Sequence, residues 1–192
     1  AGKSVLLKCL VGLLDVDMGV IDYDGRNFSA MNYKQKKGIR KEIGMLFQGS
    51  ALYDSMSVLD NVMFPLEMFT EMTLEERKER AIFCLRRVKI IESADGLFPA
   101  EISGGMQKRV ALARAIAGDP KVIFFDEPTT GLDPIMANVI NRLIREIVVE
   151  MGVTAITITH DINSTRIIAD DVAMLESGKV QWKGEINHLD NS

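Results

Sequence analysis

Apolar residues follow two different spacings along this chain, and the two spacings alternate. Short runs of apolar and β-branched residues at 42–47, 122–125 and 153–159 have the length of strands. The longer segments between them carry apolar residues at every third or fourth position, as one face of a helix does. Because strands alternate with helices, and the runs at 122 and 153 are continuous, we predict an α/β fold whose parallel sheet is covered on both faces.

Local signals place the starts and ends of the predicted helices. Thr73-Leu-Glu-Glu76 is a capping box and predicts a helix that runs to about Ile90. Pro134 fits the first turn of another helix, which Gly152 closes. This second helix carries an apolar stripe that should bury against the sheet, made of Val139, Ile140, Leu143, Ile144, Ile147 and Val148.

Residues 50–102 differ in character from the rest of the chain. Pro65 is expected to interrupt the apolar run in this segment. Methionines and aromatic residues gather here, namely Met56, Met63, Met68, Met72, Tyr53, Phe64 and Phe69. Such side chains suit two roles, the core of a helical subdomain and an adaptable groove that receives a helix of a partner protein. Opposite faces of the segment can serve the two roles.

Charged residues directly follow two of the predicted strands, Asp126-Glu127 after 122–125 and His160-Asp161 after 153–159. Ligands of open α/β sheets bind at these carboxyl ends. Gly2-Lys3-Ser4 has the form of the last part of a phosphate-binding loop, G-x-x-x-x-G-K-[ST]. Enzymes with this loop hold Mg²⁺ with an aspartate at a strand end, and a neighbouring carboxylate such as Glu127 can activate a water.

Ser103-Gly-Gly-Met-Gln107 offers a second site for an anion. These residues precede a helical run that extends to Ala117, and helix N-termini attract phosphate oxygens. Two such sites on one chain indicate a ligand that is clamped from two sides. With these motifs in order, the sequence resembles the ATP-binding cassette (ABC) ATPases. Ser103–Gln107 is similar to that family's signature motif, and Gln48 to the glutamine of its Q-loop. Asp126-Glu127 is similar to its Walker B motif, Gly131-Leu-Asp133 to its D-loop and His160 to its switch histidine.

The resemblance implies a role for each matching residue. Residues that would bind ATP are Gly2, Lys3 and Ser4 at the phosphates and, toward the nucleotide of a second subunit, Ser103, Gly104, Gly105, Gln107 and Asp133. Residues that would hold Mg²⁺ are Ser4, Gln48 and Asp126. Residues that would act in catalysis are Glu127 as general base, His160 at the γ-phosphate and Gln48 as sensor of the metal and the attacking water.

A narrower resemblance rests on Gly44–Tyr53, Ser57–Val62 and Gly131–Ala137. These segments are similar to the ATPase subunits of bacterial phospholipid transporters of the Mla/Mce type. The similarity implies ATP hydrolysis coupled to phospholipid transport. The implied partners are a second ATPase subunit, a membrane permease and an Mce-domain lipid-binding protein. The chain would then lie at the cytoplasmic face of the bacterial inner membrane, attached through the permease.

The predicted organisation is a P-loop NTPase core with an inserted helical subdomain. Residues 1–48 would start the catalytic core, residues 49–117 would form the helical subdomain with the signature motif, and residues 118–192 would complete the core. In the family, a strand and the first part of the phosphate loop precede the residues that match Gly2–Ser4. The chain is therefore expected to be truncated at its N-terminus.

Charge and composition narrow the function classes. The 192 residues carry a net charge of −4, so no overall basic field is present to bind nucleic acid. No apolar run approaches the roughly 18 residues that a membrane-spanning helix needs. Three alternatives remain, an ABC ATPase that powers transport of another substrate, a non-transport ABC ATPase, and an unrelated P-loop kinase or GTPase. The signature-like Ser103–Gln107 disfavours the kinase, and the short span from Gln48 to Ser103, without heptads, disfavours an ATPase of DNA maintenance.

Overall fold

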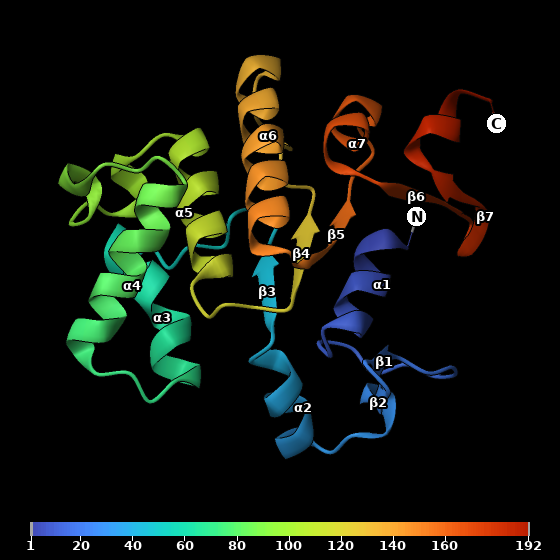
Figure 1. Cartoon of the computed structure of the whole chain (residues 1–192), viewed down its shortest axis with the longest axis horizontal. Coiled ribbons are helices and arrows are strands. Elements are labelled where there is room, and N and C mark those ends of the chain that lie inside the picture. Colours follow the sequence, from blue (N-terminus) through green and yellow to red (C-terminus); the bar gives the residue numbers. More distant parts are fainter. Residues whose placement is uncertain (1, 192) are drawn as a thin grey trace.

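A three-stranded parallel sheet lies at the centre of the protein, in a computed structural model that describes residues 2–191 (Figure 1). Its strands are β3 (Ile43–Leu46), β4 (Val122–Asp126) and β5 (Thr154–Ile158), in the order β3-β4-β5. Ile43 pairs with Val122, and Val122 pairs with Thr154, so the three strands start level and end at one edge. The predicted α/β fold with a parallel sheet is confirmed.

Helices and two small antiparallel hairpins surround this sheet. The α-helices are α1 (Lys3–Leu10), α2 (Tyr33–Arg40), α3 (Val58–Phe69), α4 (Leu74–Arg87), α5 (Gly104–Ile116), α6 (Pro134–Met151) and α7 (Ile162–Ile168). The hairpins join β1 (Asp22–Tyr23) to β2 (Arg26–Asn27) and β6 (Asp171–Glu176) to β7 (Lys179–Glu185). Short 3₁₀ turns are η1 (Phe28–Ala30), η2 (Glu92–Ala94), η3 (Pro99–Glu101) and η4 (Ile186–Asn191).

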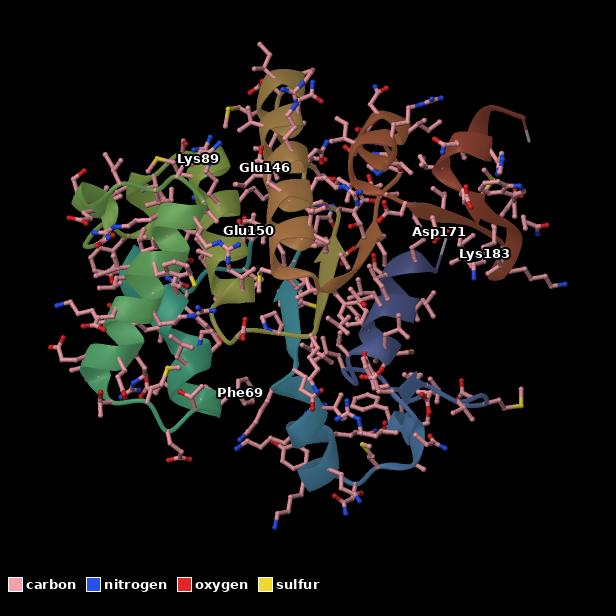
Figure 2. All side chains as sticks on the ribbon, in the orientation of Figure 1. Phe69, Lys89, Glu146, Glu150, Asp171 and Lys183 are labelled. Atoms are coloured by element: carbon pink, nitrogen blue, oxygen red, sulfur yellow. The ribbon has the colours of Figure 1, made fainter. Side chains whose placement is uncertain are left out.

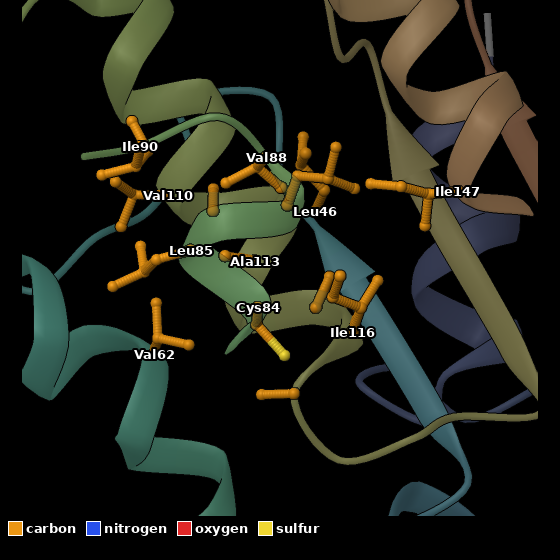
Figure 3. Close-up of a cluster of buried hydrophobic side chains, with 14 of the residues drawn as sticks. Leu46, Val62, Cys84, Leu85, Val88, Ile90, Val110, Ala113, Ile116 and Ile147 are labelled. Atoms are coloured by element: carbon orange, nitrogen blue, oxygen red, sulfur yellow. The ribbon is translucent and has the colours of Figure 1, made fainter. Parts of the chain in front are cut away.

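Side chains of β4 alternate between the two faces of the sheet, and helices cover both. Ile123 and Phe125 belong to a large apolar cluster with residues of α5 and α6. Phe124 points the other way and packs with Leu7 of α1 and Ile158 of β5. Figure 3 shows part of the larger cluster, in which side chains of α4 and α5 meet those of the sheet and α6. Burial of these apolar surfaces on both faces is the main force that holds the layers together.

A close approach between the sheet and α5 depends on Gly44 of β3. A Cβ atom at this position would lie 2.3 Å from the carbonyl oxygen of Ala115 in α5. Because that oxygen belongs to the backbone, no side-chain rotation relieves the overlap. The absence of a side chain at Gly44 thus lets α5 lie directly on β3.

The helices α3, α4 and α5 pack against one another beside the sheet (Figure 1). Their apolar side chains share one cluster with Leu46 of β3. An ion pair of 2.8 Å also joins Arg87 of α4 to Glu150 of α6 (Figure 2). The division of the chain at residues 48 and 117 stays a prediction, but most residues of its middle segment form this helical group.

Two local predictions need correction. Pro65 does not interrupt the apolar run, because it lies inside α3. A proline there removes the bond to the carbonyl of Asn61, yet Val62 and Leu66 on either side are fully buried and hold the helix in place. α4 begins with the predicted capping box but ends at Arg87, since Lys89 has a left-handed backbone with a φ of 61°.

Candidate active site

The structure brings five of the predicted residues together at the carboxyl edge of the sheet. Lys3 and Ser4 start α1, Asp126 ends β4 and Glu127 follows it, and His160 lies after the end of β5. The hydroxyl of Ser4 lies 3.3 Å from a carboxylate oxygen of Asp126, 122 residues later in the chain. The ammonium of Lys3 donates to the carbonyl of Thr159, 3.0 Å away, at the end of β5.

The N-terminus of α1 differs from that of every other α-helix among residues 2–191. Six helices have a side chain that accepts a hydrogen bond from their first turn, namely Asn32, Ser57, Thr73, Ser103, Asp133 and Asp161 for α2 to α7. α1 has none, and Gly2 precedes it with a φ of 98° and open space where a Cβ would stand. The uncapped N–H groups beside the Lys3 ammonium therefore fit the oxygens of a phosphate.

Glu127 lies in a strained and specific position. Its φ is 48°, in the left-handed region that non-glycine residues rarely adopt, and its N–H donates to the carbonyl of Ile158 at 2.9 Å. One carboxylate oxygen lies 2.9 Å from Nδ1 of His160, and the other accepts a hydrogen bond of 3.1 Å from Thr130. Sequence reasoning missed Thr130, although a hydroxyl three residues after a candidate base is a usable signal.

Asp126 and Ser4 supply donors of the kind that Mg²⁺ prefers. Asp126 is only 8% exposed, and the Ser4 hydroxyl is its hydrogen-bond partner. Within residues 2–191 there is no group of three or more His, Cys, Asp or Glu side chains that would cage a metal. Mg²⁺ is commonly held by one or two protein oxygens together with the phosphates of a nucleotide, and this donor set fits that arrangement.

Gln48 follows β3 by two residues and has an exposed side chain. Its backbone carbonyl accepts a hydrogen bond from Lys108 of α5. Lys108 is 5% exposed, and burial lowers the pKa of its ammonium, whereas the charge of Asp126 acts to raise it. Sequence reasoning missed Lys108, since nothing local marks it as buried.

The second predicted anion site lies at the start of α5. The hydroxyl of Ser103 caps the helix by accepting from the N–H of Met106 at 3.3 Å, and a Cβ on Gly104 would meet open space. Gly105 packs against Met136 of α6, and the Gln107 amide donates to the carbonyl of Pro99 at 2.8 Å. α1 and α5 pack on opposite faces of the sheet, and their N-terminal ends lie apart (Figure 1).

Asp133 lies at the start of α6, where one carboxylate oxygen accepts from the N–H groups of Ile135 and Met136 at 3.0 Å each. The preceding Gly131 and Leu132 line a cavity of about 660 Å³ together with His160. The structure thus brings the D-loop-like segment next to the switch-like histidine, and the Asp133 side chain serves as a helix cap.

Known proteins match this chain in sequence and in fold. A sequence profile described as ABC transporter matches residues 1–130. The chain belongs to the ABC transporter family. It is an ABC-type ATPase, built on the fold of the family's ATP-binding cassettes. Among residues 2–191, no helix is long and apolar enough to cross a membrane.

Individual relatives cover nearly the whole chain. The intermembrane phospholipid transport system ATP-binding protein MlaF of Escherichia coli K12 is 39% identical over 188 residues, which are 98% of this chain and 70% of MlaF. The methionine import ATP-binding protein MetN of Carboxydothermus hydrogenoformans is 38% identical over 98% of this chain and 56% of its own. The dimeric cassette MJ0796 bound to ADP and Pi has a TM-score of 0.87 and 32% identity, covering 96% of this chain and 81% of its own.

Proposed function

We propose that this ABC ATPase drives phospholipid transport across the bacterial cell envelope. The observation that carries its ATPase chemistry is the convergence of Lys3, Ser4, Asp126, Glu127 and His160 beside the uncapped start of α1. Support for a phospholipid substrate comes from the similarity to MlaF, whose name describes intermembrane phospholipid transport. The residues at Gly44–Tyr53 and Gly131–Ala137 carry the same resemblance.

In this proposal each residue acts on the triphosphate from a defined place. The N–H groups after Gly2 and the Lys3 ammonium bind the phosphates. Ser4, Asp126 and Gln48 would hold Mg²⁺, which would supply positive charge to neutralise the phosphates. Glu127 accepts the proton of the attacking water, while His160 keeps the Glu127 carboxylate oriented and faces the γ-phosphate.

The second anion site serves a second copy of the chain. Ser103, Gly104, Gly105 and Gln107 would bind the nucleotide that is held by the partner, and Asp133 would reach across the dimer. The separation of α1 and α5 supports this arrangement, because one chain cannot close both sites on one nucleotide (Figure 1). Ser103→Arg in the full-length protein is expected to keep ATP binding but to prevent ATP-dependent dimerisation on size exclusion. Normal dimerisation would contradict the shared site.

A membrane permease would dock on the helical group. A cavity of about 480 Å³ lies between β3, α3 and α5, and its lining includes Tyr53, Phe64, Pro65 and Phe69. Aromatic side chains of this kind receive apolar helices well. The methionines between 56 and 72 lie outside this lining, and Met63 packs against the core instead. An Mce-domain protein would complete the transporter, with the ATPase at the cytoplasmic face of the inner membrane.

The second candidate is a cassette that powers transport of another substrate. MetN, named for methionine import, matches this chain at 38% identity, close to the value for MlaF. The probable ribonucleotide transport ATP-binding protein mkl of Mycobacterium leprae is also 40% identical over 174 residues. The catalytic residues are the same in this alternative, and only the permease and the cargo differ.

Reconstitution with the permease separates the two candidates. In liposomes, the complex is expected to move labelled phospholipid when ATP is supplied and to show ATPase activity that responds to phospholipid. The same complex carrying Glu127→Gln is the control for ATP dependence. Transport of methionine or another small solute, without movement of lipid, would refute the phospholipid assignment and leave the ATPase intact.

A further inference from the structure

Three polar side chains are buried together where α6, α7 and the loop after β4 (residues 127–133) meet. Asn141 of α6 is 1% exposed, Ser164 of α7 is fully buried, and Thr129 of the loop after β4 is 9% exposed. Helices α6 and α7 lie side by side (Figure 1). Burying polar groups costs free energy unless they find hydrogen-bond partners. The stability of this contact therefore depends on how the three side chains bond to one another.

The hydrogen bonds of this cluster run in one direction, toward Asp161. A carboxylate can only accept, so the Ser164 hydroxyl donates its single proton to Asp161, at 2.5 Å. The amide nitrogen of Asn141 donates to the Ser164 oxygen at 2.8 Å. The Thr129 hydroxyl lies 3.4 Å from the same oxygen and can act there only as a second donor. The bond from Ser164 lowers the pKa of the Asp161 carboxyl, so this acceptor stays ionised.

Asp161 directly follows His160 in the loop after β5 (residues 159–161), and its bonds fix the backbone there. Its carboxylate accepts from the N–H groups of Asn163 and Ser164 at 3.2 and 3.0 Å. Its own N–H donates to the hydroxyl of Thr159 at 3.0 Å. Because His160 lies between Thr159 and Asp161, its exposed imidazole extends from a backbone that is restrained on both sides.

The cluster also reaches the loop that carries Glu127. In this loop the N–H of Thr130 bonds to the carbonyl of Glu127, and the Thr130 hydroxyl bonds to the Glu127 carboxylate. The side chains of Glu127 and His160 contact each other at 2.9 Å, which joins the loops after β4 and β5 once. The buried Ser164 hydroxyl joins the same two loops a second time, through Thr129 and Asp161.

A role in stability alone does not explain this cluster. Within residues 2–191, the side-chain oxygen of Asn141 is buried and has no hydrogen-bond partner, which costs free energy. Apolar side chains fill the neighbouring positions of α6 without that cost, as Ile140 and Ile144 do. A buried polar network does something that apolar packing does not, because directional bonds fix the groups they join in one arrangement. The cluster thus favours precise placement over maximal stability.

We propose that Ser164 is a positioning residue that fixes the loop of Glu127 relative to the loop of His160. Asn141 and Thr129 support it, because their donated bonds leave the Ser164 proton directed at Asp161. The proposal rests on the proposed roles of Glu127 and His160 in ATP hydrolysis, and it is independent of the transported substrate. Without the Ser164 hydroxyl the two loops can shift independently, and the base is then less well aligned with the attacking water.

The test removes hydroxyls from the cluster in the full-length protein. Ser164→Ala is expected to lower kcat for ATP about tenfold, and Thr129→Val about threefold. KM should stay within about twofold in both, because nucleotide binding is kept and alignment is lost. Thr129→Ser, which keeps the hydroxyl, should retain nearly full kcat. Thr129→Val has nearly the shape of the original side chain and so keeps the proposal testable if Ser164→Ala does not fold.

The matched control breaks a different bond between the same two helices. Arg145 of α6 donates to the carbonyl of Ile168 at 3.3 Å and to the carboxylate of Asp170 at 2.8 and 2.9 Å, at the end of α7 away from His160. Arg145→Met is therefore expected to lower Tm without lowering kcat. If Arg145→Met lowers kcat as much as Ser164→Ala does, the effect belongs to helix packing and the positioning role is overturned.

The imidazole of His160 gives a measurement that needs no turnover. In NMR spectra of protein labelled at histidine and free of nucleotide, a His160→Gln variant identifies the resonances of this ring. They are expected to be single and sharp in the unmodified protein and in Arg145→Met, and broadened or doubled in Ser164→Ala, because the ring then samples several positions. Identical resonances in all three proteins would overturn the proposal.

Glu127→Gln separates this inference from the proposed function. If Glu127→Gln is inactive while Ser164→Ala and Thr129→Val keep full kcat, only the positioning role is overturned. If Glu127→Gln keeps its turnover, the proposed catalytic roles and the positioning role fall together. Loss of kcat in all three variants, with an unchanged KM, is the result that supports both.

Discussion

Charged side chains at the two ends of the parallel sheet have different kinds of partner. At the amino end, the carboxylate of Glu42 accepts two hydrogen bonds from Arg26, at 2.8 and 2.9 Å, and lies 3.1 Å from Lys121. At the carboxyl end, Lys3 donates to a backbone carbonyl, and Asp126 and Glu127 accept from uncharged hydroxyls or contact a histidine. One end neutralises its charges within the chain, and the other leaves them available to a ligand.

From this difference we infer that the amino end of the sheet contributes to stability and the carboxyl end to activity. Ion pairs at the amino end are complete in the absence of any ligand, so their loss should be felt in folding. At the carboxyl end, Lys3 bonds a backbone carbonyl, Asp126 a hydroxyl, and Glu127 a hydroxyl and the His160 ring, so loss of these side chains should be felt in nucleotide chemistry. Substitutions at the two ends can test the contrast directly.

The largest effect is expected at Glu127. Glu127→Gln in the full-length protein should lower kcat by about 100-fold or more, because a general base contributes that much to proton transfer. ATP affinity and Tm should stay near those of the unmodified protein, measured by calorimetry. Thr130→Val, which keeps the carboxylate and removes one of its hydrogen bonds, should lose less activity. Undiminished turnover of Glu127→Gln would remove this residue from the mechanism.

The next largest effect is expected at Asn61, which bonds the loop after β3. It tests whether any contact at the carboxyl end of the sheet contributes to stability. Asn61→Ala should lower the free energy of unfolding by about 3 kcal/mol, because the buried Asn61 side chain loses its bond from the N–H of Tyr53 and those it donates to the carbonyls around it. Urea denaturation measures the loss. Asn138→Ala, at an exposed site on α6, is the control and should change stability by less than about 0.5 kcal/mol. Equal effects would show that the loop after β3 needs no such support.

A smaller effect is expected at Glu42, and it depends on pH. The hydrogen bonds from Arg26 lower the pKa of Glu42 from 4.5 to about 2, with Lys121 acting in the same direction. The folded form therefore gains stability that is fully present above pH 4.5 and is lost as the pH falls toward 2. Glu42→Gln should cost about 1 kcal/mol at pH 7, since water partly screens this pair, and nothing near pH 2.

Thermal unfolding of both proteins at several pH values measures this difference. Glu146→Gln serves as the control, because Glu146 is an exposed glutamate of α6 (Figure 2). If the difference in Tm between Glu42→Gln and the unmodified protein stays constant from pH 7 to pH 2, the charge of Glu42 does not stabilise the amino end of the sheet.

The smallest effect is expected at Lys89, which lies at neither end of the sheet and gives a reference value for changes in stability. Lys89, visible at the end of α4 in Figure 2, has a left-handed backbone, and its N–H and that of Ile90 bond to the carbonyls of Arg86 and Leu85. This position normally takes glycine, so Lys89→Gly should raise stability by about 0.5 kcal/mol. Lys89→Ala, which also removes the charge but keeps a Cβ, should show no gain in Tm.

The features that the sequence predicted well are those with short-range signals. The continuous apolar run at 122–125 can only be a buried segment, and Asp133-Pro134 marks a helix start through an acceptor side chain and a fixed φ. The meeting of Asp126 and His160 at one edge followed from a rule about parallel sheets. These predictions needed no knowledge of which side chains touch.

The contacts of the loop after β3 could not be predicted in this way. α5 is buried almost all round, so Lys108 has no polar face to mark it, and its bond to Gln48 joins residues 60 positions apart. Pro65 carried a strong signal for a break, which the packing of α3 overrode. The roles of the individual site residues stay predictions.

The uncapped start of α1 makes nucleotide binding and local folding parts of one equilibrium. α1 has eight residues, and an isolated helix of that length is marginal in water. Val5 and Leu6 in its first turn are 55% and 49% exposed, so packing supports this end weakly. A phosphate that accepts from the first turn then acts as the missing cap, and part of its binding free energy is spent on ordering the helix. The observed affinity for ATP would thus report the folding of α1 as well as the contacts that ATP makes.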